Sequence, residues 1–435
     1  MKHELVALID GRVVGRAWET SGKYTFRYDD VWRDTAGTFP LSISLPLARV
    51  EHRDEVVRPY LANLLPDNDA ILRAWSRTYQ VSANNPLALL VQVGQECPGA
   101  LQLLPPRRAE EILSAPPRSD VVEWLLEEEV GARLRHVLEE PGAWREPGDP
   151  GQFSLAGAQP KIALLCAGDR WGVPSGRTPT THILKPPALE KFAGFAENEH
   201  VCLRLATRLG LAAARSEVRR FGGQTAIVVE RYDRVRRDEG WLRLHQEDLC
   251  QALGVHPYDK YQSDGGPSAA DVIGLISERS LEPDVDVATM VGALALNWTI
   301  AGTDAHAKNY SCLIEPGGLI RLAPLYDIIS LLPYRESRGP RTKLAMSIGG
   351  EYRMRFIERR HWERLADAIG VERGALVDLV AEIVERIPDA LRDVCSECAD
   401  TGLAHPVLDR LQTEVSKHAS SCAASLRRPG LSPAN

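Results

Sequence analysis

The order of strand and helix patterns in this sequence predicts an α+β fold made of two lobes. Strand-like segments dominate up to residue 245, whereas the chain after it reads mainly as helices, apart from one hairpin. Near the amino terminus, Asp10-Gly11 lies between two short apolar runs, which is a strong hairpin signal. We therefore expect a mixed-sheet N-lobe, including a small N-terminal α+β subdomain, followed by a mainly helical C-lobe.

Residues 1–106 are predicted to form the N-terminal subdomain. Short apolar runs flanked by turn residues indicate strands, and apolar residues at helical spacing indicate helices. The expected strands are residues 5–9, 13–17, 24–28 and 100–104, and the expected helices are residues 57–65, 68–79 and 86–93. Pro105-Pro106 ends the last strand, because proline cannot continue a hydrogen-bonded ladder.

Residues 107–245 are predicted to form the core of the N-lobe. A charged helix is expected over residues 121–138, followed by a Gly- and Pro-rich loop from Glu140 to Gly151. The expected strands are residues 153–166, 171–174, 182–184, 217–221 and 225–230, with one helix over residues 196–209.

Residues 246–419 are predicted to form the helical C-lobe. Its most apolar helix-like run, residues 293–301, leads into a loop and then a hairpin around Glu315-Pro316-Gly317-Gly318. The arginine-dense residues 355–364 also contain glutamates, which favours a solvated helix face. The tail, residues 420–435, is rich in small residues and proline, so we expect it to be disordered.

Composition limits the classes of function. A net charge of −7 argues against a protein that binds nucleic acid alone through bulk electrostatics. No apolar run reaches the length of a membrane span and the first residues lack a signal-peptide pattern, so we expect a soluble, cytoplasmic protein. Eight scattered cysteines suit a reducing compartment. Cys395 and Cys398 form a lone C-x-x-C, which is too few ligands for a structural zinc site.

The residues that indicate a function are Asp304, Asn309 and Asp327. An Asp, an Asn five residues later, and a second Asp after a hairpin form the set that protein kinases use. The first Asp can accept the proton of an attacking hydroxyl, and the other two residues can bind magnesium ions that neutralise ATP phosphates. This spacing also occurs by chance in loops, but the order of helix, loop and hairpin is that of a kinase C-lobe. The sequence therefore predicts a protein-kinase-like fold and phosphoryl transfer.

Two earlier segments are candidates for binding ATP phosphates. Residues 154–161 are mostly small, which lets backbone N–H groups approach a phosphate, although an ordinary tight turn explains them equally well. Lys185 ends an apolar strand, where a kinase places its phosphate-binding lysine; an exposed strand-end lysine is the alternative. Glu197 lies on the same helical stripe as Val201, so we expect Glu197 rather than Glu199 to pair with this lysine.

A third segment, residues 228–233, is a buried strand that breaks into a charged turn. A kinase offers backbone groups to adenine at such a hinge, and Tyr232 could pack on the ring. An ordinary strand exit with a solvated Glu-Arg pair is the alternative.

Together, these segments resemble the HipA family of serine/threonine kinases, the toxin halves of bacterial type II toxin–antitoxin pairs. The resemblance covers nearly the whole chain. It includes residues 63–68, 99–103, 154–161, 182–187, 229–233, 246–254, 297–309 and 324–330.

The resemblance implies a role for each matching residue. Asp304 is implied as the catalytic base, Asn309 and Asp327 as magnesium ligands, and Ser154 as a site of autophosphorylation. The implied nucleotide-binding residues are Ala156, Gly157, Ala158, Gln159, Pro160, Lys161, Lys185, Glu230, Arg231, Tyr232, His306, Lys308 and Tyr326. Two positions depart from the family pattern, since Pro160 stands where an acidic residue is common and Ala305 where glycine is common.

The family also implies partners. The expected substrate is an aminoacyl-tRNA synthetase, glutamyl-tRNA synthetase first, whose phosphorylation arrests growth. A small helix-turn-helix antitoxin of the HipB type would bind the protein and mediate its contact with operator DNA. Two rival functions stay open: a kinase that acts on a small molecule, and a non-catalytic co-repressor that bridges antitoxin dimers on DNA.

Overall fold

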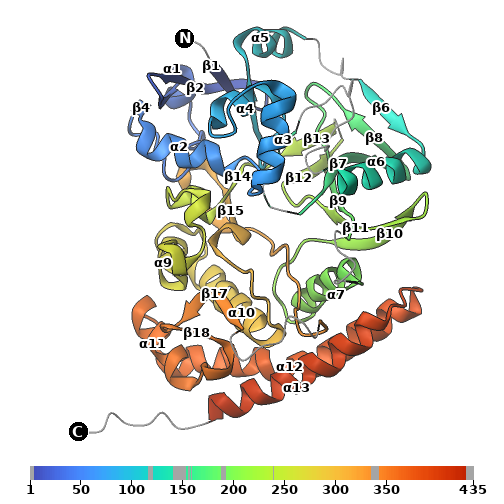
Figure 1. Ribbon diagram of the computed structural model, residues 1–435. Helices are drawn as coiled ribbons and strands as arrows, with labels where there is room; N and C mark the ends of the chain where they lie inside the picture. Colours follow the sequence, from blue (N-terminus) through green and yellow to red (C-terminus); the bar gives the residue numbers. More distant parts are fainter. Residues whose placement is uncertain are drawn as a thin grey trace. The chain divides into compact units, whose positions relative to one another are not determined.

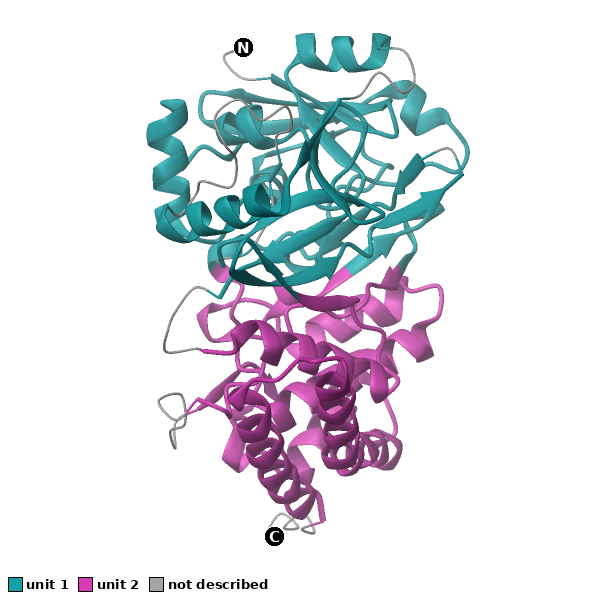
Figure 2. Ribbon diagram, turned by 90° about the vertical axis from the view of Figure 1, so that its right-hand side faces the viewer, with its two compact units in different colours: residues 1–188, 219–258, 312–320 teal, residues 189–218, 259–311, 321–435 magenta. Residues whose placement is uncertain are grey.

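The computed structural model describes residues 4–115, 121–140, 153–154, 157, 159–187, 193–238, 240–334 and 342–427. The chain divides into two compact units, which are coloured separately in Figure 2. Unit 1 comprises residues 1–188, 219–258 and 312–320, and unit 2 comprises residues 189–218, 259–311 and 321–435.

The amino-terminal part of unit 1 contains a five-stranded sheet in the order β4-β3-β2-β1-β5 (Figure 1). Asp10 and Gly11 both have positive φ angles, +47° and +70°, which confirms the predicted hairpin. The strands are β1 (Glu4–Ile9), β2 (Arg12–Thr20), β3 (Lys23–Tyr28), β4 (Glu51–His52) and β5 (Leu101–Leu104).

Five helices accompany this sheet along the chain. The three predicted helices are confirmed, and the side chain of Asn85 caps the last of them. The helix after Pro105 was not predicted, because the proline pair that ends the strand also starts this helix. The helices are α1 (Asp30–Asp34), α2 (Asp54–Asn63), α3 (Asp69–Tyr79), α4 (Pro86–Val93) and α5 (Pro106–Ser114).

A six-stranded sheet in the order β10-β11-β9-β7-β8-β6 follows. The strands are β6 (Val122–Leu125), β7 (Ile162–Ala167), β8 (Arg170–Pro174), β9 (His182–Lys185), β10 (Ser216–Phe221) and β11 (Gln224–Glu230). One core of buried apolar side chains includes residues from β1 through β11.

Two predictions for this part of the chain were wrong. The helix expected over residues 121–138 begins only at Glu127, as α6 (Glu127–Glu139), because residues 122–125 pair with β8 as a strand. The strand expected over residues 153–166 starts only at Ile162, since Pro160 has no N–H to donate to a ladder. The predicted loop, residues 140–151, lies outside the described residues apart from Glu140.

Unit 2 is mainly helical, as predicted for the C-lobe. Its longer elements are α7 (Phe195–Arg208), α9 (Ala269–Arg279), α10 (Pro283–Ile300), β17 (Lys343–Ile348), β18 (Glu351–Arg353), α11 (Arg359–Ile369), α12 (Arg373–Asp400) and α13 (Pro406–Arg427). The disorder expected from residue 420 was wrong as far as Arg427, because Cys422 and Leu426 are buried on α13. Residues 428–435 lie outside the described part of the chain.

Short elements connect the longer ones. They are β12 (Arg234–Arg237), β13 (Gly240–Arg243), β14 (Gln246–Asp248), α8 (Leu249–Ala252), β15 (Ser311–Ile314) and β16 (Ile320–Leu322). Strands β15 and β16 are the two arms of the predicted hairpin, and they pair in the sheet β14-β15-β16.

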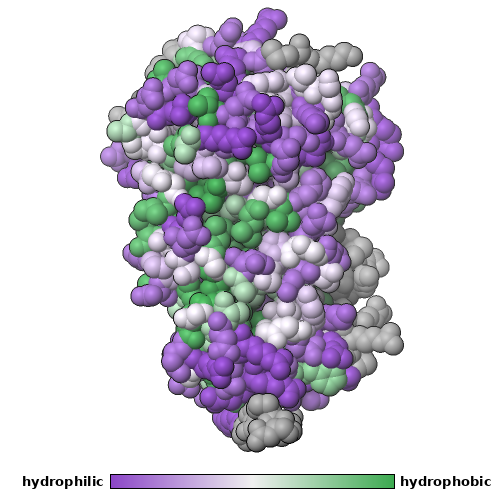
Figure 3. Space-filling model, turned by 90° about the vertical axis from the view of Figure 1, so that its left-hand side faces the viewer, coloured by the Kyte–Doolittle hydropathy of each residue, from purple (hydrophilic) through white to green (hydrophobic). Residues whose placement is uncertain are grey.

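No helix in the described residues is long and apolar enough to cross a membrane. Hydrophilic side chains cover much of the molecular face drawn in Figure 3.

One buried carboxyl group predicts how stability depends on pH. Glu247 on β14 is fully buried, and its Oε1 accepts the Ile43 N–H at 2.8 Å, whereas its Oε2 has no hydrogen-bond partner among the described residues. Burial raises the pKa of Glu247 to about 8. Between pH 4.5 and 8 the unfolded chain therefore releases a proton that the folded chain keeps, so this group's contribution to stability is lost as the pH rises through that range.

We expect Glu247→Gln to become increasingly more stable than the wild type as the pH rises from about 5 to about 8.5. Glutamine resembles the protonated acid but cannot ionise, and each unit of pKa shift corresponds to roughly 1.4 kcal/mol. Thermal melts of both proteins across this range test the prediction, with the exposed Glu110→Gln as control. A difference in melting temperature that does not change with pH would contradict it.

Candidate active site

The loop that carries Asp304 begins where α10 ends. Ala301 adopts a left-handed conformation, φ +56°, and the N–H groups of Ala301 and Gly302 both donate to the Asn297 carbonyl. The Asn297 side chain in turn donates to the Ala293 carbonyl and to the Tyr310 hydroxyl. A Cβ atom on Gly302 would lie 2.1 Å from Asn297 Oδ1, so only glycine allows this close turn toward Asp304.

Gly302→Ala is therefore expected to displace Asn297 and with it the start of the loop. We expect the free energy of unfolding to fall by about 1–3 kcal/mol. We also expect the rate of phosphoryl transfer to fall by more than this loss of stability alone would explain. Gly274→Ala is the matched control, because a Cβ at this exposed position of α9 meets nothing within 4 Å and alanine favours a helix. Equal melting temperatures and activities for both variants would contradict the steric argument.

Asp304 and Asn309 are joined by a compact network of hydrogen bonds. The Asp304 carbonyl accepts the His306 N–H and Asn309 Nδ2, each at 2.8 Å. Because Nδ2 of Asn309 is used within the loop, its Oδ1 is the amide atom left to bind a cation. The Asp304 side chain is 66% exposed, so its carboxylate is accessible from solvent.

The segment that carries Asp327 is tied to this loop on one side and to the end of α10 on the other. Before Asp327, the Tyr326 hydroxyl donates to the Lys308 carbonyl at 3.1 Å and shares a 2.7 Å hydrogen bond with Ser311 Oγ. After it, Ser330 Oγ donates to the Ile300 carbonyl at 2.6 Å. Asp327 itself is exposed and has a φ angle of +56°. Unit 2 therefore holds the segments of all three predicted motif residues together.

The residues of this loop suit a magnesium ion. Magnesium prefers oxygen ligands and is usually held by one or two carboxylates together with substrate phosphates and water. Asp327 and Asn309 Oδ1 supply such oxygens. In the described part of the chain, no three His, Cys, Asp or Glu side chains gather closely enough to hold a metal ion by themselves.

His306 and Lys308 are both buried beside this loop. His306 Nε2 lies 3.9 Å from Asp304 Oδ1, and its ring packs edge-on against Tyr261 with ring centroids 4.9 Å apart. The Tyr261 hydroxyl donates to Asp304 Oδ1 at 2.6 Å. Tyr261 has no sequence signal as a site residue, because nothing local connects it to a residue 43 positions later.

In unit 1, Ser154 is fully buried. Its Oγ donates to the Leu64 carbonyl at 2.6 Å, and its N–H donates to the Glu96 carbonyl at 2.8 Å. Further along the predicted phosphate loop, Gly157 has a φ angle of +100°, and a Cβ there would lie 2.6 Å from Lys161 Nζ. The Lys161 side chain therefore folds back over the loop. Gln159 and Pro160 are half-buried, whereas Ala156 and Ala158 lie outside the described residues.

Lys185 and Glu230 lie at opposite ends of the pairing between β9 and β11. Lys185 is opposite Ile227, and Glu230 is opposite His182. Lys185 is 8% exposed at the end of its strand. The two predicted nucleotide-binding residues thus belong to neighbouring strands of the same sheet.

Sequence periodicity places Glu197 on the inward apolar stripe of α7 and Glu199 off it, and the burial of these two residues differs from that expectation. On α7, Glu197 is half-buried, whereas Glu199 is 1% exposed. Every residue from 198 to 203 is buried, so α7 is covered over a wider arc than the four-residue stripe through Glu197.

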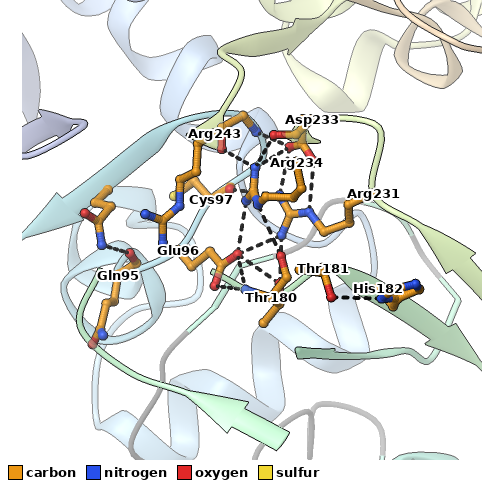
Figure 4. Close-up of polar contacts among 12 residues, drawn as sticks. Gln95, Glu96, Cys97, Thr180, Thr181, His182, Arg231, Asp233, Arg234 and Arg243 are labelled. Carbon is orange, nitrogen blue, oxygen red and sulfur yellow. Dashed lines mark hydrogen bonds and ion pairs between the residues drawn. The ribbon is translucent and has the colours of Figure 1, made fainter. Parts of the chain in front are cut away.

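The Arg231 side chain belongs to a buried ion network (Figure 4). It donates to both carboxylate oxygens of Asp233, at 3.0 and 2.9 Å, and to Glu96 Oε1 at 3.0 Å. Arg234 contacts the same two acids. The backbone of Arg231 is also bonded within the protein, since its N–H donates to the Thr181 carbonyl at 2.9 Å and its carbonyl accepts the Arg234 N–H at 3.2 Å. The neighbouring Tyr232 donates its hydroxyl to Gln246 Oε1 at 2.5 Å.

The charges of this network stabilise one another. Burial alone would raise the pKa of Asp233, but Arg231 and Arg234 outweigh that effect and lower the pKa to about 2. The pKa of Glu96 is also lowered, because the same two arginines and Arg243 outweigh its burial. Both acids are thus ionised inside unit 1.

Two family models match this sequence. The one described as the HipA-like C-terminal domain matches residues 153–391, and the one described as the HipA N-terminal domain matches residues 5–104.

Individual proteins are similar over most of the chain. Y4mE, a candidate kinase of Sinorhizobium fredii, is 36% identical over 394 residues, which cover 90% of this chain and 91% of the relative. The serine/threonine-protein kinase toxin HipA of Shewanella oneidensis is 29% identical over 402 residues, covering 86% and 85%. A solved complex of HipA, HipB and operator DNA from Shewanella oneidensis contains a chain that matches with a TM-score of 0.81 at 25% identity, covering 97% of both chains.

Proposed function

The chain belongs to the HipA family and is a serine/threonine-protein kinase of the toxin type, and we propose that it uses ATP and magnesium to phosphorylate a protein substrate. The observation that supports this most directly is that Tyr326 ties the Asp327 segment to the Asp304 loop, while Ser330 ties the same segment to the end of α10. These contacts keep the segments of Asp304, Asn309 and Asp327 in one region of unit 2, which supports their proposed roles as base and magnesium ligands.

The proposed roles follow the chemistry of each side chain. Asp304 accepts the proton of the attacking hydroxyl, and Asn309 and Asp327 bind magnesium, which neutralises charge on the phosphates when it is present. Lys308, His306 and Tyr326 belong to the same loop region and line the nucleotide. The proposed ATP-binding residues of unit 1 are the loop 156–161 with Lys161, Lys185, and residues 230–232.

The proposal is tested with purified protein, magnesium and ATP labelled at the γ-phosphate. Label should appear on a serine or threonine of a protein, and it should disappear when magnesium is chelated. Label that appears on a small molecule alone would favour the rival small-molecule kinase. Mass spectrometry of cells expressing the protein, compared with cells expressing Asp304→Asn, then identifies the target. We propose that the target is an aminoacyl-tRNA synthetase, with glutamyl-tRNA synthetase as the first candidate. If no aminoacyl-tRNA synthetase of the cell gains a phosphorylated residue, that choice is contradicted.

We propose that autophosphorylation of Ser154 switches the kinase off. A phosphate adds roughly −1.5 to −2 charge, and the buried Ser154 hydroxyl faces the Leu64 carbonyl, which repels an anion. The modified segment would have to leave its position, and the adjoining phosphate loop would leave with it. We expect Ser154→Asp to bind ATP at least tenfold more weakly, whereas Ser154→Ala keeps ATP affinity and loses one hydrogen bond. Calorimetry measures both, and full ATP affinity in Ser154→Asp would contradict the switch.

We also propose a helix-turn-helix antitoxin of the HipB type as the partner. The support is the relative's solved complex with HipB and operator DNA, together with the net charge of −7. Gel-shift assays should show no binding of this chain alone to operator DNA and a larger complex when the antitoxin is added. The non-catalytic co-repressor remains the rival, and unchanged toxicity of Asp304→Ala in cells would favour it.

A further inference from the structure

The segment that precedes α9 is held in one conformation within unit 2. The Tyr261 carbonyl accepts the N–H groups of Asp264 and Gly266, each at 3.0 Å. A Cβ on Gly266 would lie 1.9 Å from the Asp259 carbonyl oxygen, so this tight turn requires glycine. The next residue, Gln262, accepts the N–H of Ser347 on β17 at 2.7 Å through its side chain. The backbone of Tyr261 is therefore fixed from both directions.

The side chain of Tyr261 is fixed as well. Its ring meets the His306 ring edge-on, at an interplanar angle of 86°, and His306 is 2% exposed. Lys260 Nζ lies 5.4 Å from the centroid of the Tyr261 ring. The hydroxyl at the end of this held ring donates to Asp304 Oδ1 at 2.6 Å, which is a short hydrogen bond to a carboxylate.

This hydrogen bond matters because Asp304 projects into solvent. A carboxylate that is 66% exposed loses rotamer freedom whenever it is held in one orientation. The accepting oxygen of a general base must lie within about 2.6–3.2 Å of the oxygen whose proton it takes, and a small misplacement slows the reaction strongly. A carboxylate has about four acceptor positions, so one donor does not prevent it from accepting a second hydroxyl.

We propose that Tyr261 is a positioning residue for phosphoryl transfer, whose hydroxyl holds the Asp304 carboxylate in the orientation that receives the proton of the substrate serine or threonine. This inference rests on the proposed function. In the step concerned, the substrate oxygen bonds to the γ-phosphorus of ATP while the bond from that phosphorus to the bridging oxygen breaks and ADP leaves. The substrate's proton passes to Asp304, and Tyr261 keeps its own.

The test is Tyr261→Phe, which removes the hydroxyl and keeps the ring against His306. We expect kcat to fall about 10- to 100-fold, the KM for ATP to stay within about twofold, and the melting temperature to stay the same. Tyr258→Phe is the control, because this tyrosine is 64% exposed and lies outside the proposed site. Its kcat should equal that of the wild type.

A double-mutant cycle shows whether Tyr261 acts through Asp304. Single-turnover rates with excess enzyme are compared for Asp304→Asn with and without Tyr261→Phe. We expect no further loss in the double variant, since the carboxylate that Tyr261 orients is already absent. An additive loss, an unchanged kcat in Tyr261→Phe, or a loss explained by a lower melting temperature each overturns the inference. A wild-type protein that transfers no phosphate overturns the proposed function itself, whereas an active wild type with a normal Tyr261→Phe variant overturns only this inference.

Discussion

Replacing Asp304 with asparagine is expected to lower the rate of phosphoryl transfer by about 10²- to 10⁴-fold without unfolding the protein. Asparagine has nearly the same shape, but its amide cannot accept the proton of an attacking hydroxyl. The side chain is largely exposed, and the bonds that close the loop use the backbone carbonyl of Asp304, so the fold does not depend on the carboxylate.

Initial rates of transfer from labelled ATP, measured together with melting temperatures, check this expectation. Asp378→Asn is the matched control, because it makes the same chemical change at an exposed position of α12. Activity of Asp304→Asn within tenfold of the wild type, at equal stability, would mean that another group accepts the proton.

Much of the loop region in unit 2 could be predicted from the sequence because its signals are local. An apolar run, a turn and a hairpin lie within about thirty residues of one another, and short-range patterns determine such elements. The structure adds what holds them together. The Asn297 carbonyl accepts backbone N–H groups at the end of α10, and Ser330 ties the Asp327 segment to that same helix end. The Ser330 contact has no sequence signal, since Ser330 and Ile300 lie 30 residues apart and meet only after folding.

The predictions for Arg231 and Glu197 were limited in the same way, because both depend on neighbours that are brought together only by folding. The Glu-Arg pair at residues 230–231 looked like a solvated strand exit or part of an adenine site. In the structure the Arg231 side chain is instead buried and bonded to Glu96, which lies 135 residues earlier in the sequence. Similarly, the stripe through Glu197 assumed a single buried face on α7, whereas packing buries Glu199 as well. Local periodicity cannot show how many neighbours will cover a helix.

The ion network in unit 1 predicts the largest effect on stability. Replacing Arg231 with methionine should destabilise the protein by roughly 3–5 kcal/mol, the usual cost of removing one partner from a buried ion pair. Glu96 and Asp233 would each lose a donor, and both are almost completely inaccessible to water. Methionine fills much of the same volume, so the expected loss comes from charge rather than from a cavity.

Urea unfolding at neutral pH measures this loss as a lower midpoint at an unchanged slope. Arg392→Met is the control, because its side chain is 59% exposed in a surface ion pair, which contributes about 0–1 kcal/mol. Arg234 still contacts both acids in Arg231→Met, so the network keeps one negative charge in excess; adding Glu96→Gln should recover part of the stability, since that excess charge is then removed. If Arg231→Met unfolds at the same urea concentration as Arg392→Met, Glu96 and Asp233 must be neutralised without Arg231, and the network would not hold this part of unit 1.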